Sequence, residues 1–224
     1  MARRGLVEHG TAADAAAHDT HDTATRARLL ATAARLFAER GFAKVTVRDI
    51  CRKARANVAA VNYHFGGKLG LYHEVMQLAI REMQATTETA REAGARQPPE
   101  EQLRTYIDVF VRRVVGSDQS NWIHQLVRQE IADPTPAFDL VMQQAFRPRL
   151  DYLFGVIAEL IGCSPEDPRV ARCAMSVQVQ CLALLHNPMA AKISPAFERT
   201  PDTLEAMADH IARFSLAGIR ELRG

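Results

Sequence analysis

Apolar residues recur three and four positions apart along most of this chain, which is the spacing of one face of an α-helix. Over residues 25–40, Leu29, Ala33 and Leu36 share a face, and Gly41 follows as a helix stop. No run of alternating apolar and polar residues is long enough to predict a strand. The pattern therefore predicts an all-α protein.

Two short helices are expected within residues 46–68. Thr46 is a suitable N-cap for the first helix, and Asn57 is a suitable N-cap for the second. After Asn57, Val61 and Phe65 recur at helical spacing before a pair of glycines ends the run. Two helices at this separation have the outline of a helix-turn-helix, a motif whose second helix enters the major groove of DNA.

A longer helix is expected over residues 68–93, and two adjacent prolines in the stretch 94–100 end it. Prolines also punctuate the remainder of the chain. The further helices expected there span residues 100–116, 119–132, 135–161, 167–186 and 201–222. The chain is thus predicted to contain about nine helices.

This pattern divides the chain into three parts. Residues 1–22 are small and polar without helical periodicity, and we expect them to form a flexible tail. Residues 23–70 contain the predicted helix-turn-helix, and residues 71–224 contain most of the remaining helices. The helix that begins at residue 68 is expected to join these last two parts.

Charge strengthens the case for a DNA-binding segment. Between Thr23 and His73 the chain has ten basic and two acidic residues, a local charge of +8, whereas the whole chain carries +2, so the rest sums to −6. A basic block in an otherwise acidic chain is typical of a module that binds phosphates. A basic face that is merely solvated is the alternative interpretation of the charge alone.

A series of positions between residues 41 and 72 carries a resemblance to a known family. They are Gly41-Phe42, Thr46, Asp49-Ile50, Ala54, Asn57, Tyr63-His64-Phe65, Gly66, Lys68 and Leu71-Tyr72. This set resembles the N-terminal domain of the TetR family of bacterial transcriptional repressors. The resemblance implies a homodimeric, all-helical repressor whose larger C-terminal domain binds a small-molecule inducer.

The sequence departs from the family pattern at a few of these positions. The family usually has Ala at Cys51, Gly at Arg55, Val at Ala56 and an acid at Leu69. Arg55 falls in the turn between the two short helices, where Gly would relieve the strain of a positive φ. An Arg there is expected to strain the turn or shift its register, and it also adds a charge near the DNA backbone.

Ten residues of this segment are expected to contact DNA. Arg48 can hydrogen-bond a guanine edge, and the small side chains of the second helix can pack against thymine methyl groups. Tyr63 and His64 can donate to backbone phosphates, and Lys68 is a phosphate clamp by charge and by resemblance; for His64 the alternative is an exposed histidine without a role. The full set is Thr46, Arg48, Asn57, Val58, Ala59, Ala60, Asn62, Tyr63, His64 and Lys68.

The stretch from Ser120 to Val170 resembles one branch of the same family, the CecR-like repressors. That likeness is looser than the likeness of the N-terminal segment. It implies control of transport or drug-efflux genes, and it does not imply which inducer is bound.

A ligand pocket is expected among the helices of the larger part. Aromatic and methionine side chains with a few amides suit an apolar ligand that carries polar groups, although each residue alone also fits ordinary core packing. The predicted pocket residues are Met76, Phe110, Trp122, Gln125, Leu126, Gln129, Phe138, Met142, Phe146 and Gln178. Trp122 is preferred because it is the only tryptophan. Either His124 or Arg128 is a candidate partner for an anionic ligand, and a solvent-facing role is the equal alternative for both.

The last two helices are expected to form a homodimer. They carry more apolar surface than one small domain easily hides, although several of these side chains belong to the core. The predicted interface residues are Val177, Leu182, Leu185, Leu204, Met207, Ile211 and Phe214. A helix-turn-helix regulator needs two copies to read paired half-sites one helical turn apart.

Other classes of function have less support. The sequence has no HExxH, Walker or GxSxG motif, so we expect no catalytic residues, and no enzyme built on a helical bundle. The four cysteines form no CxxC pair, and we expect no metal or cofactor. No apolar run approaches the roughly 20 residues of a membrane helix, so a cytoplasmic protein is expected. A DNA-binding architectural protein without a ligand is the remaining alternative.

Overall fold

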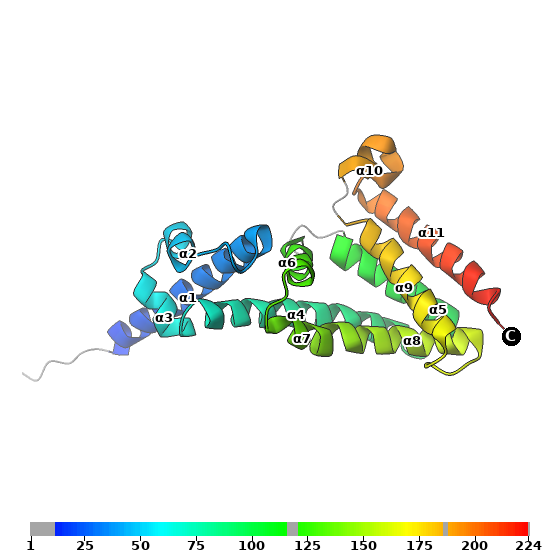
Figure 1. Ribbon diagram of the computed structural model, residues 1–224, viewed down its shortest axis with the longest axis horizontal. Helices are drawn as coiled ribbons and strands as arrows, with labels where there is room; N and C mark the ends of the chain where they lie inside the picture. Colours follow the sequence, from blue (N-terminus) through cyan, green and yellow to red (C-terminus); the bar gives the residue numbers. More distant parts are fainter. Residues whose placement is uncertain (1–11, 116–120, 186–187, 224) are drawn as a thin grey trace, which may run out of the picture. The chain divides into compact units, whose positions relative to one another are not determined.

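A computed structural model describes residues 12–115, 121–185 and 188–223. The described residues form helices and connecting turns, with no strand among them, which confirms the predicted all-α class (Figure 1). The chain divides into two compact units, Met1–Val75 and Met76–Gly224. The division falls within the helix that was expected to join the two domains. No helix in the described ranges is both long and apolar enough to cross a membrane.

The first unit contains α1 (Ala12–Arg40), α2 (Val47–Ala54), α3 (Val58–Phe65) and the first two turns of α4 (Lys68–Gly94). Its apolar side chains are hidden from solvent at the positions that the helical spacing predicted. Those exposed by 1% or less are Leu29, Ala33, Leu36, Phe37, Val45, Ile50, Val61, Leu71 and Val75. The ring of Tyr72 packs edge-on against Phe37, with 4.9 Å between ring centres, and so anchors the start of α4 in this core.

The first helix begins earlier than the sequence pattern predicted. We expected it to start near Thr25, but α1 begins at Ala12. Five of its first six residues are alanine, the residue with the highest helix propensity, so the segment forms a helix without an apolar face. Of the predicted tail, residues 1–11 lie outside the described residues, and the rest belongs to α1.

The second unit is built from the rest of α4 and a series of shorter helices. These are α5 (Pro99–Phe110) with a π-helical turn at Val111–Val115, α6 (Asn121–Ala132), α7 (Ala137–Val141) with a π-helical turn at Met142–Phe146, α8 (Arg147–Ile161), α9 (Pro168–Ala183), α10 (Pro188–Ile193), a 3₁₀ turn at Pro195–Phe197 and α11 (Pro201–Arg220). Helices α5, α8, α9 and α11 lie side by side and enclose one apolar core (Figure 1).

Two details of this unit differ from the predicted helices. The single helix expected over residues 135–161 begins at Ala137 and is interrupted by the π-helical turn at Met142–Phe146. The short helix α10 was missed, because Pro188 and Pro195 suggested only punctuation between longer helices. Pro188 occupies the first position of α10, where its missing N–H has no partner to lose.

Candidate functional site

The N-terminus of α2 is fixed by a reciprocal cap. The Thr46 hydroxyl accepts a hydrogen bond from the Asp49 N–H at 3.2 Å, and the Asp49 carboxylate accepts one from the Thr46 N–H at 3.2 Å. The hydrogen bonds from Thr46 lower the pKa of Asp49, which keeps this carboxylate charged. Arg52 lies 2.8 Å from the same carboxylate. The predicted N-cap is therefore confirmed, and it presents the exposed Thr46 and Arg48 at the first turn.

The turn after α2 has a positive φ at Arg55, the position where the family usually has glycine. Arg55 lies in the left-handed region at φ 51° and ψ 49°, and its N–H bonds to the Cys51 carbonyl. Asn57 then caps α3, its side chain accepting from the Ala59 N–H at 3.0 Å. The chain thus keeps the helix-turn-helix geometry with an arginine in a conformation that favours glycine.

Helix α3 has one buried face and one exposed face, as its spacing predicted. Val61 and Phe65 are buried. The opposite face presents Val58, Ala59 and Asn62 to solvent, with Ala60 partly covered. Tyr63 is 78% exposed, so its hydroxyl is free of the core. The side chains expected to contact base edges are therefore on the solvent side of α3, and their contact with DNA stays a prediction.

Two of the residues expected to contact phosphates, His64 and Lys68, are less exposed than the sequence suggested. The His64 side chain is only 7% exposed, and its Nε2 lies 3.3 Å from Asp22 on α1. The Lys68 Nζ lies 4.2 Å from the centre of the Phe42 ring. Partial burial lowers the pKa of Lys68. Both residues therefore have partners within the unit, and a phosphate contact by either one remains a prediction.

Gly70 sets the approach of α4 to the end of α3. A Cβ at this position would lie 1.8 Å from the carbonyl oxygen of Phe65. No side chain fits at that distance, so any other residue would push α4 away from α3. Gly70 was missed by the sequence reasoning, because a glycine within a helix reads only as a weak helix former.

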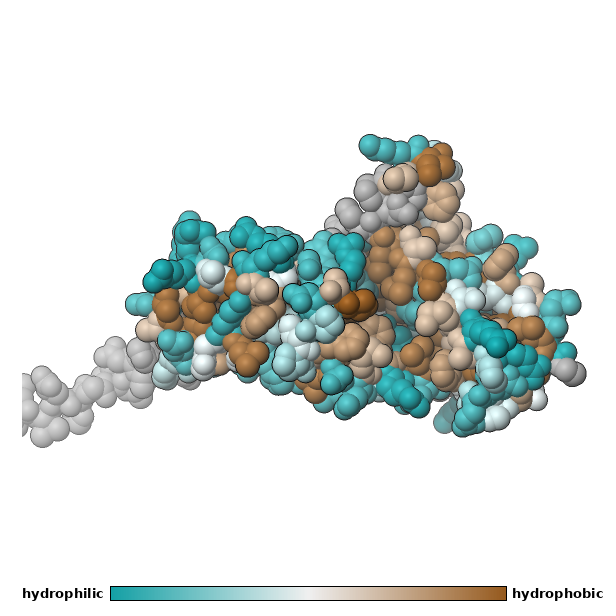
Figure 2. Space-filling view, viewed as in Figure 1, coloured by the Kyte–Doolittle hydropathy of each residue, from teal (hydrophilic) through white to brown (hydrophobic). Residues whose placement is uncertain are grey.

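Eight of the ten basic residues in the block are exposed, and only Arg26 and Lys68 are partly buried. Four of the exposed ones border one concavity of about 570 Å³, with α1 on one side and the end of α2 on the other; they are Arg28, Arg35, Lys53 and Arg55. Figure 2 shows hydrophilic side chains over α2. Four bases of the block are therefore gathered on one surface. The sequence analysis counted them in the block but did not include them among the ten expected DNA contacts.

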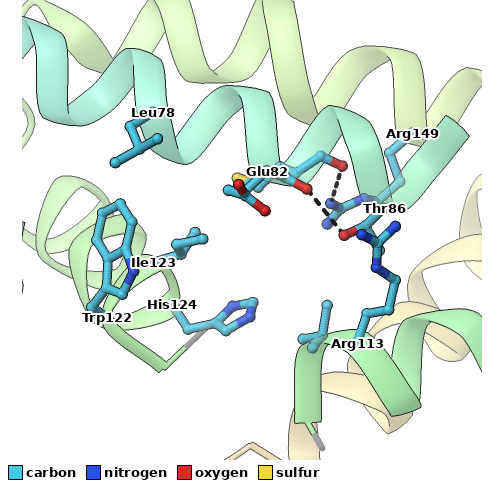
Figure 3. A pocket seen from close by; sticks show the side chains of 10 residues that line it. Leu78, Glu82, Thr86, Arg113, Trp122, Ile123, His124 and Arg149 are labelled. Atoms are coloured by element: carbon cyan, nitrogen blue, oxygen red, sulfur yellow. Dashed lines mark hydrogen bonds between the residues drawn. The ribbon is translucent and has the colours of Figure 1, made fainter. Parts of the chain in front are cut away.

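A cavity of about 390 Å³ lies within the second unit. Helix α4 contributes Leu78, Glu82, Met83 and Thr86, and α6 contributes Trp122, Ile123 and His124. The turn after α5 adds Arg113 and Val114, and α8 adds Arg149. Figure 3 shows the indole of Trp122 on one side of this space and both arginine side chains on the other.

Arg149 is buried in the wall of this cavity, with 3% of its surface exposed. Its Nη2 donates to the Met83 carbonyl at 3.2 Å, and its Nε donates to the Thr87 hydroxyl at 3.3 Å. Burial, together with the nearby charge of Arg149, lowers the pKa of His124 to about 4. His124 is therefore neutral near pH 7.

Of the ten predicted pocket residues, the structure places only Trp122 in the cavity wall. Phe110 lies behind it, with its ring 5.2 Å from the Arg149 guanidinium carbon. Gln178 is in the core, where its side-chain oxygen accepts from the Tyr106 hydroxyl at 2.7 Å. The seven others do not line this cavity: Met76, Gln125, Leu126, Gln129, Phe138, Met142 and Phe146.

For Met76 the reason is the rotation of α4. The cavity-lining residues of this helix recur one turn apart at positions 78, 82 and 86, whereas Met76 belongs to the neighbouring buried stripe. The sequence does contain a signal for Arg149, which the sequence analysis missed. Arg149 lies four residues before Leu153 and seven before Val156, on the apolar stripe of α8, where a charged residue is unexpected.

The predicted dimer residues divide into core and surface. Val177, Leu204 and Ile211 are buried within their own chain, which corrects their assignment to an interface. Leu182, Leu185 and Met207 are partly exposed. Phe214 on α11 is 64% exposed, and on α9 Met175 and Val179 are 56% and 53% exposed. The apolar face available to a partner is therefore narrower than the sequence suggested.

Comparison with known families identifies two regions of the chain. A model described as bacterial regulatory proteins, tetR family, matches residues 29–75. A model described as the C-terminal domain of the HTH-type transcriptional dual regulator CecR matches residues 99–219. Together the two matches span the helix-turn-helix and most of the second unit.

Individual relatives agree with these matches. The HTH-type transcriptional dual regulator CecR of Shigella flexneri is 29% identical over 151 residues, which cover 64% of this chain and 67% of that protein. A probable HTH-type transcriptional regulator of Bacillus subtilis, YttP, is 28% identical over 142 residues, covering 58% of this chain and 68% of that protein.

Solved structures show the same fold. A putative transcriptional regulator from Pseudomonas aeruginosa aligns with a TM-score of 0.65 at 19% identity, covering 89% of this chain and 93% of that one. The TetR-family regulator SCO4454 from Streptomyces coelicolor aligns with a TM-score of 0.63 at 21% identity, covering 88% and 97%.

Proposed function

Because this chain belongs to the TetR family of bacterial regulatory proteins, with a CecR-type C-terminal domain, and is a DNA-binding transcriptional regulator, we propose that it represses its target genes as a homodimer and leaves its operator when a small molecule binds. The family and its relatives are transcriptional regulators and not enzymes. Transport or efflux genes are the proposed targets, and the cytoplasm, which holds the DNA, is the proposed location.

The exposed face of α3 is the proposed reader of the operator. Arg48 and the small side chains of α3 contact base edges, while Tyr63 and the basic concavity hold backbone phosphates. Two copies are required, because a palindromic operator presents the same half-site twice. The exposed apolar side of α9 and α11, centred on Phe214, is the proposed contact between the copies.

The observation that carries the ligand response is the course of α4. This one helix supplies Leu71 and Tyr72 to the core of the DNA-binding unit and Leu78, Glu82 and Thr86 to the cavity wall. A ligand that binds two arrangements of α4 with different affinity changes the population of the DNA-binding one. A cavity of about 390 Å³ also disfavours the alternative of an architectural protein without a ligand.

A gel shift tests the proposal directly. The purified protein is mixed with DNA that flanks its own gene and, in parallel, with a random duplex library from which bound sequences are selected. We expect a shift that weakens steeply with salt, since phosphate contacts supply much of the affinity. Arg48→Ala should weaken the shift and relax the selected sequence, whereas Tyr63→Phe should weaken binding to every sequence alike.

Arg147→Ala is the matched control, since this arginine is exposed on α8 in the second unit and pairs only with Asp151 among the described residues. It should leave the shift unchanged. An enriched sequence without two-fold symmetry, or equal loss of specificity in all three variants, contradicts the proposed mode of binding.

A further inference from the structure

Arg149 is a buried cation without a buried anion. Its three contacts are the Met83 carbonyl, the Thr87 hydroxyl and the ring of Phe110, and none of these carries a negative charge. No carboxylate of the described residues forms an ion pair with it. Burial is also the main influence on its pKa, which is lowered.

Holding an unpaired guanidinium out of water is unfavourable, and replacement of buried charges by apolar residues of similar volume often stabilises a protein. The surroundings of Arg149 on α8 are apolar, so a Met or Leu would fit the pattern of that stripe. The charge therefore has to be explained by something other than packing. Arg149 borders the cavity, so an anion that enters this space can reach the guanidinium.

The cavity has an apolar side and a cationic side. Figure 3 shows Leu78, Trp122 and Ile123 facing Arg113 and Arg149 across the open space. The Arg113 guanidinium already donates to the Ala85 carbonyl and the Thr89 hydroxyl, so it adds positive potential without being a free donor. A molecule spanning this space meets apolar surface at one end and positive charge at the other.

The two other titratable groups in the wall limit the charge of a ligand. His124 is neutral near pH 7, because burial and the charge of Arg149 hold its pKa near 4. Glu82 is the one carboxylate among the lining residues that the structure describes, and it is exposed to solvent. The buried charge of Arg149 is therefore the feature of the described wall that favours an anion, and one guanidinium pairs with one carboxylate.

We propose that the cavity binds an organic monoanion, a carboxylate on a compact apolar body, with the carboxylate paired to Arg149 and the apolar body against Trp122 and Leu78. This rests on the ligand response proposed above and names the chemical class of the ligand. A bidentate pair between a guanidinium and a carboxylate gives both geometry and charge recognition. The carboxylate of Glu82 lies in the same wall and repels the bound anion.

The size of the cavity guides the choice of probe. A volume of about 390 Å³ corresponds to about a dozen water molecules at about 30 Å³ each. 4-Cyclohexylbutanoate has a comparable number of non-hydrogen atoms and does not absorb where tryptophan is excited. 4-Cyclohexylbutanamide has the same shape without the charge, and 4-cyclohexylbutylamine reverses the charge.

Binding is followed by the fluorescence of Trp122, the only tryptophan, in the full-length protein at constant ionic strength without DNA. We expect the carboxylate to bind at least about tenfold more tightly than the amide, and the amine to bind most weakly. Arg149→Met should remove the preference for the carboxylate. Glu82→Gln, a change at an exposed position, should strengthen binding of the carboxylate several-fold.

Equal binding of amide and carboxylate, a preference that survives in Arg149→Met, or no carboxylate binding at millimolar concentration would overturn the proposal. If Arg149→Met does not fold, as judged by circular dichroism, Glu82→Gln decides: unchanged or weaker carboxylate binding refutes the charge argument. A gel shift with the same probes separates the two proposals. A carboxylate that binds but leaves the DNA complex intact refutes the ligand response and not the anion site.

Discussion

Replacing Arg55 with glycine should stabilise the protein while weakening its hold on DNA. A left-handed conformation costs a residue with a side chain about 1–2 kcal/mol, and Arg55 adopts it at φ 51°. Glycine relieves that strain but has more freedom in the unfolded chain, which offsets about 0.4–1 kcal/mol. We therefore expect the free energy of unfolding to rise by about 0.5–1 kcal/mol per chain.

The same change removes a charge from the basic concavity shared with Arg28, Arg35 and Lys53. If each Arg55 of a dimer neutralises one phosphate, the salt slope of DNA binding should fall by up to about 1.8. Stability and affinity then move in opposite directions, which loss of folding cannot produce.

Arg55→Ala is the matched control for this experiment, because it removes the charge and keeps the strained backbone. Urea unfolding and salt-dependent gel shifts are measured for all three proteins. Both variants should lose the same salt dependence, and only Arg55→Gly should gain stability. If the glycine variant is no more stable than the alanine variant, the turn stores no strain. If neither variant changes the salt slope, Arg55 does not touch a phosphate.

Three other changes probe the remaining sites. Gly70→Ala should destabilise the protein by about 2–3 kcal/mol in urea unfolding, because the new Cβ would meet the Phe65 carbonyl; a gain in stability, as helix propensity alone predicts, would refute the close approach. Phe214→Glu should yield monomers by light scattering, because a charge enters the proposed dimer face; an unchanged dimer mass would contradict that face. The depressed pKa of His124 makes unfolding easier as the pH falls from 6.5 towards 4, by at most about 3 kcal/mol, since the unfolded chain takes up the proton first. His124→Gln should flatten the stability curve in that window, and an unchanged curve would count against a buried neutral imidazole.

The helix-turn-helix could be predicted almost residue by residue, because the signals that define it are local. Thr46 and Asn57 cap the helices that follow them, and both caps form within three residues. The left-handed turn at Arg55 was indicated by the family resemblance, which has glycine there, and the sequence left open whether the arginine would strain the turn or shift its register. A helix cap involves only residues that are neighbours in the chain, so it can be predicted from the sequence alone.

The cavity could not be predicted in the same way, because its walls come from four separated segments. Which side of each helix faces the space depends on how the helices are rotated against one another, and apolar residues cover more than one side of α4, α6 and α8. The exposed side of α9 and α11 was misjudged for a related reason. Val177 and Val179 are two residues apart and equally apolar, yet one is buried and the other is half exposed.

Two of the residues that break the local rules of this fold lie on surfaces that the proposed function uses. Arg55 adopts a conformation that favours glycine, and it lies beside the exposed arginine and lysine side chains of the DNA-binding unit. Arg149 places a charge on an apolar stripe, beside the cavity. Arg96, after the end of α4, is a second arginine in the left-handed region, at φ 67°. Most other caps and core positions of the described residues agree with one another, as expected of a sequence whose local and global preferences coincide. Each exception is unfavourable for stability, so a gain in stability on its removal, with a loss of binding, would identify what the residue is for.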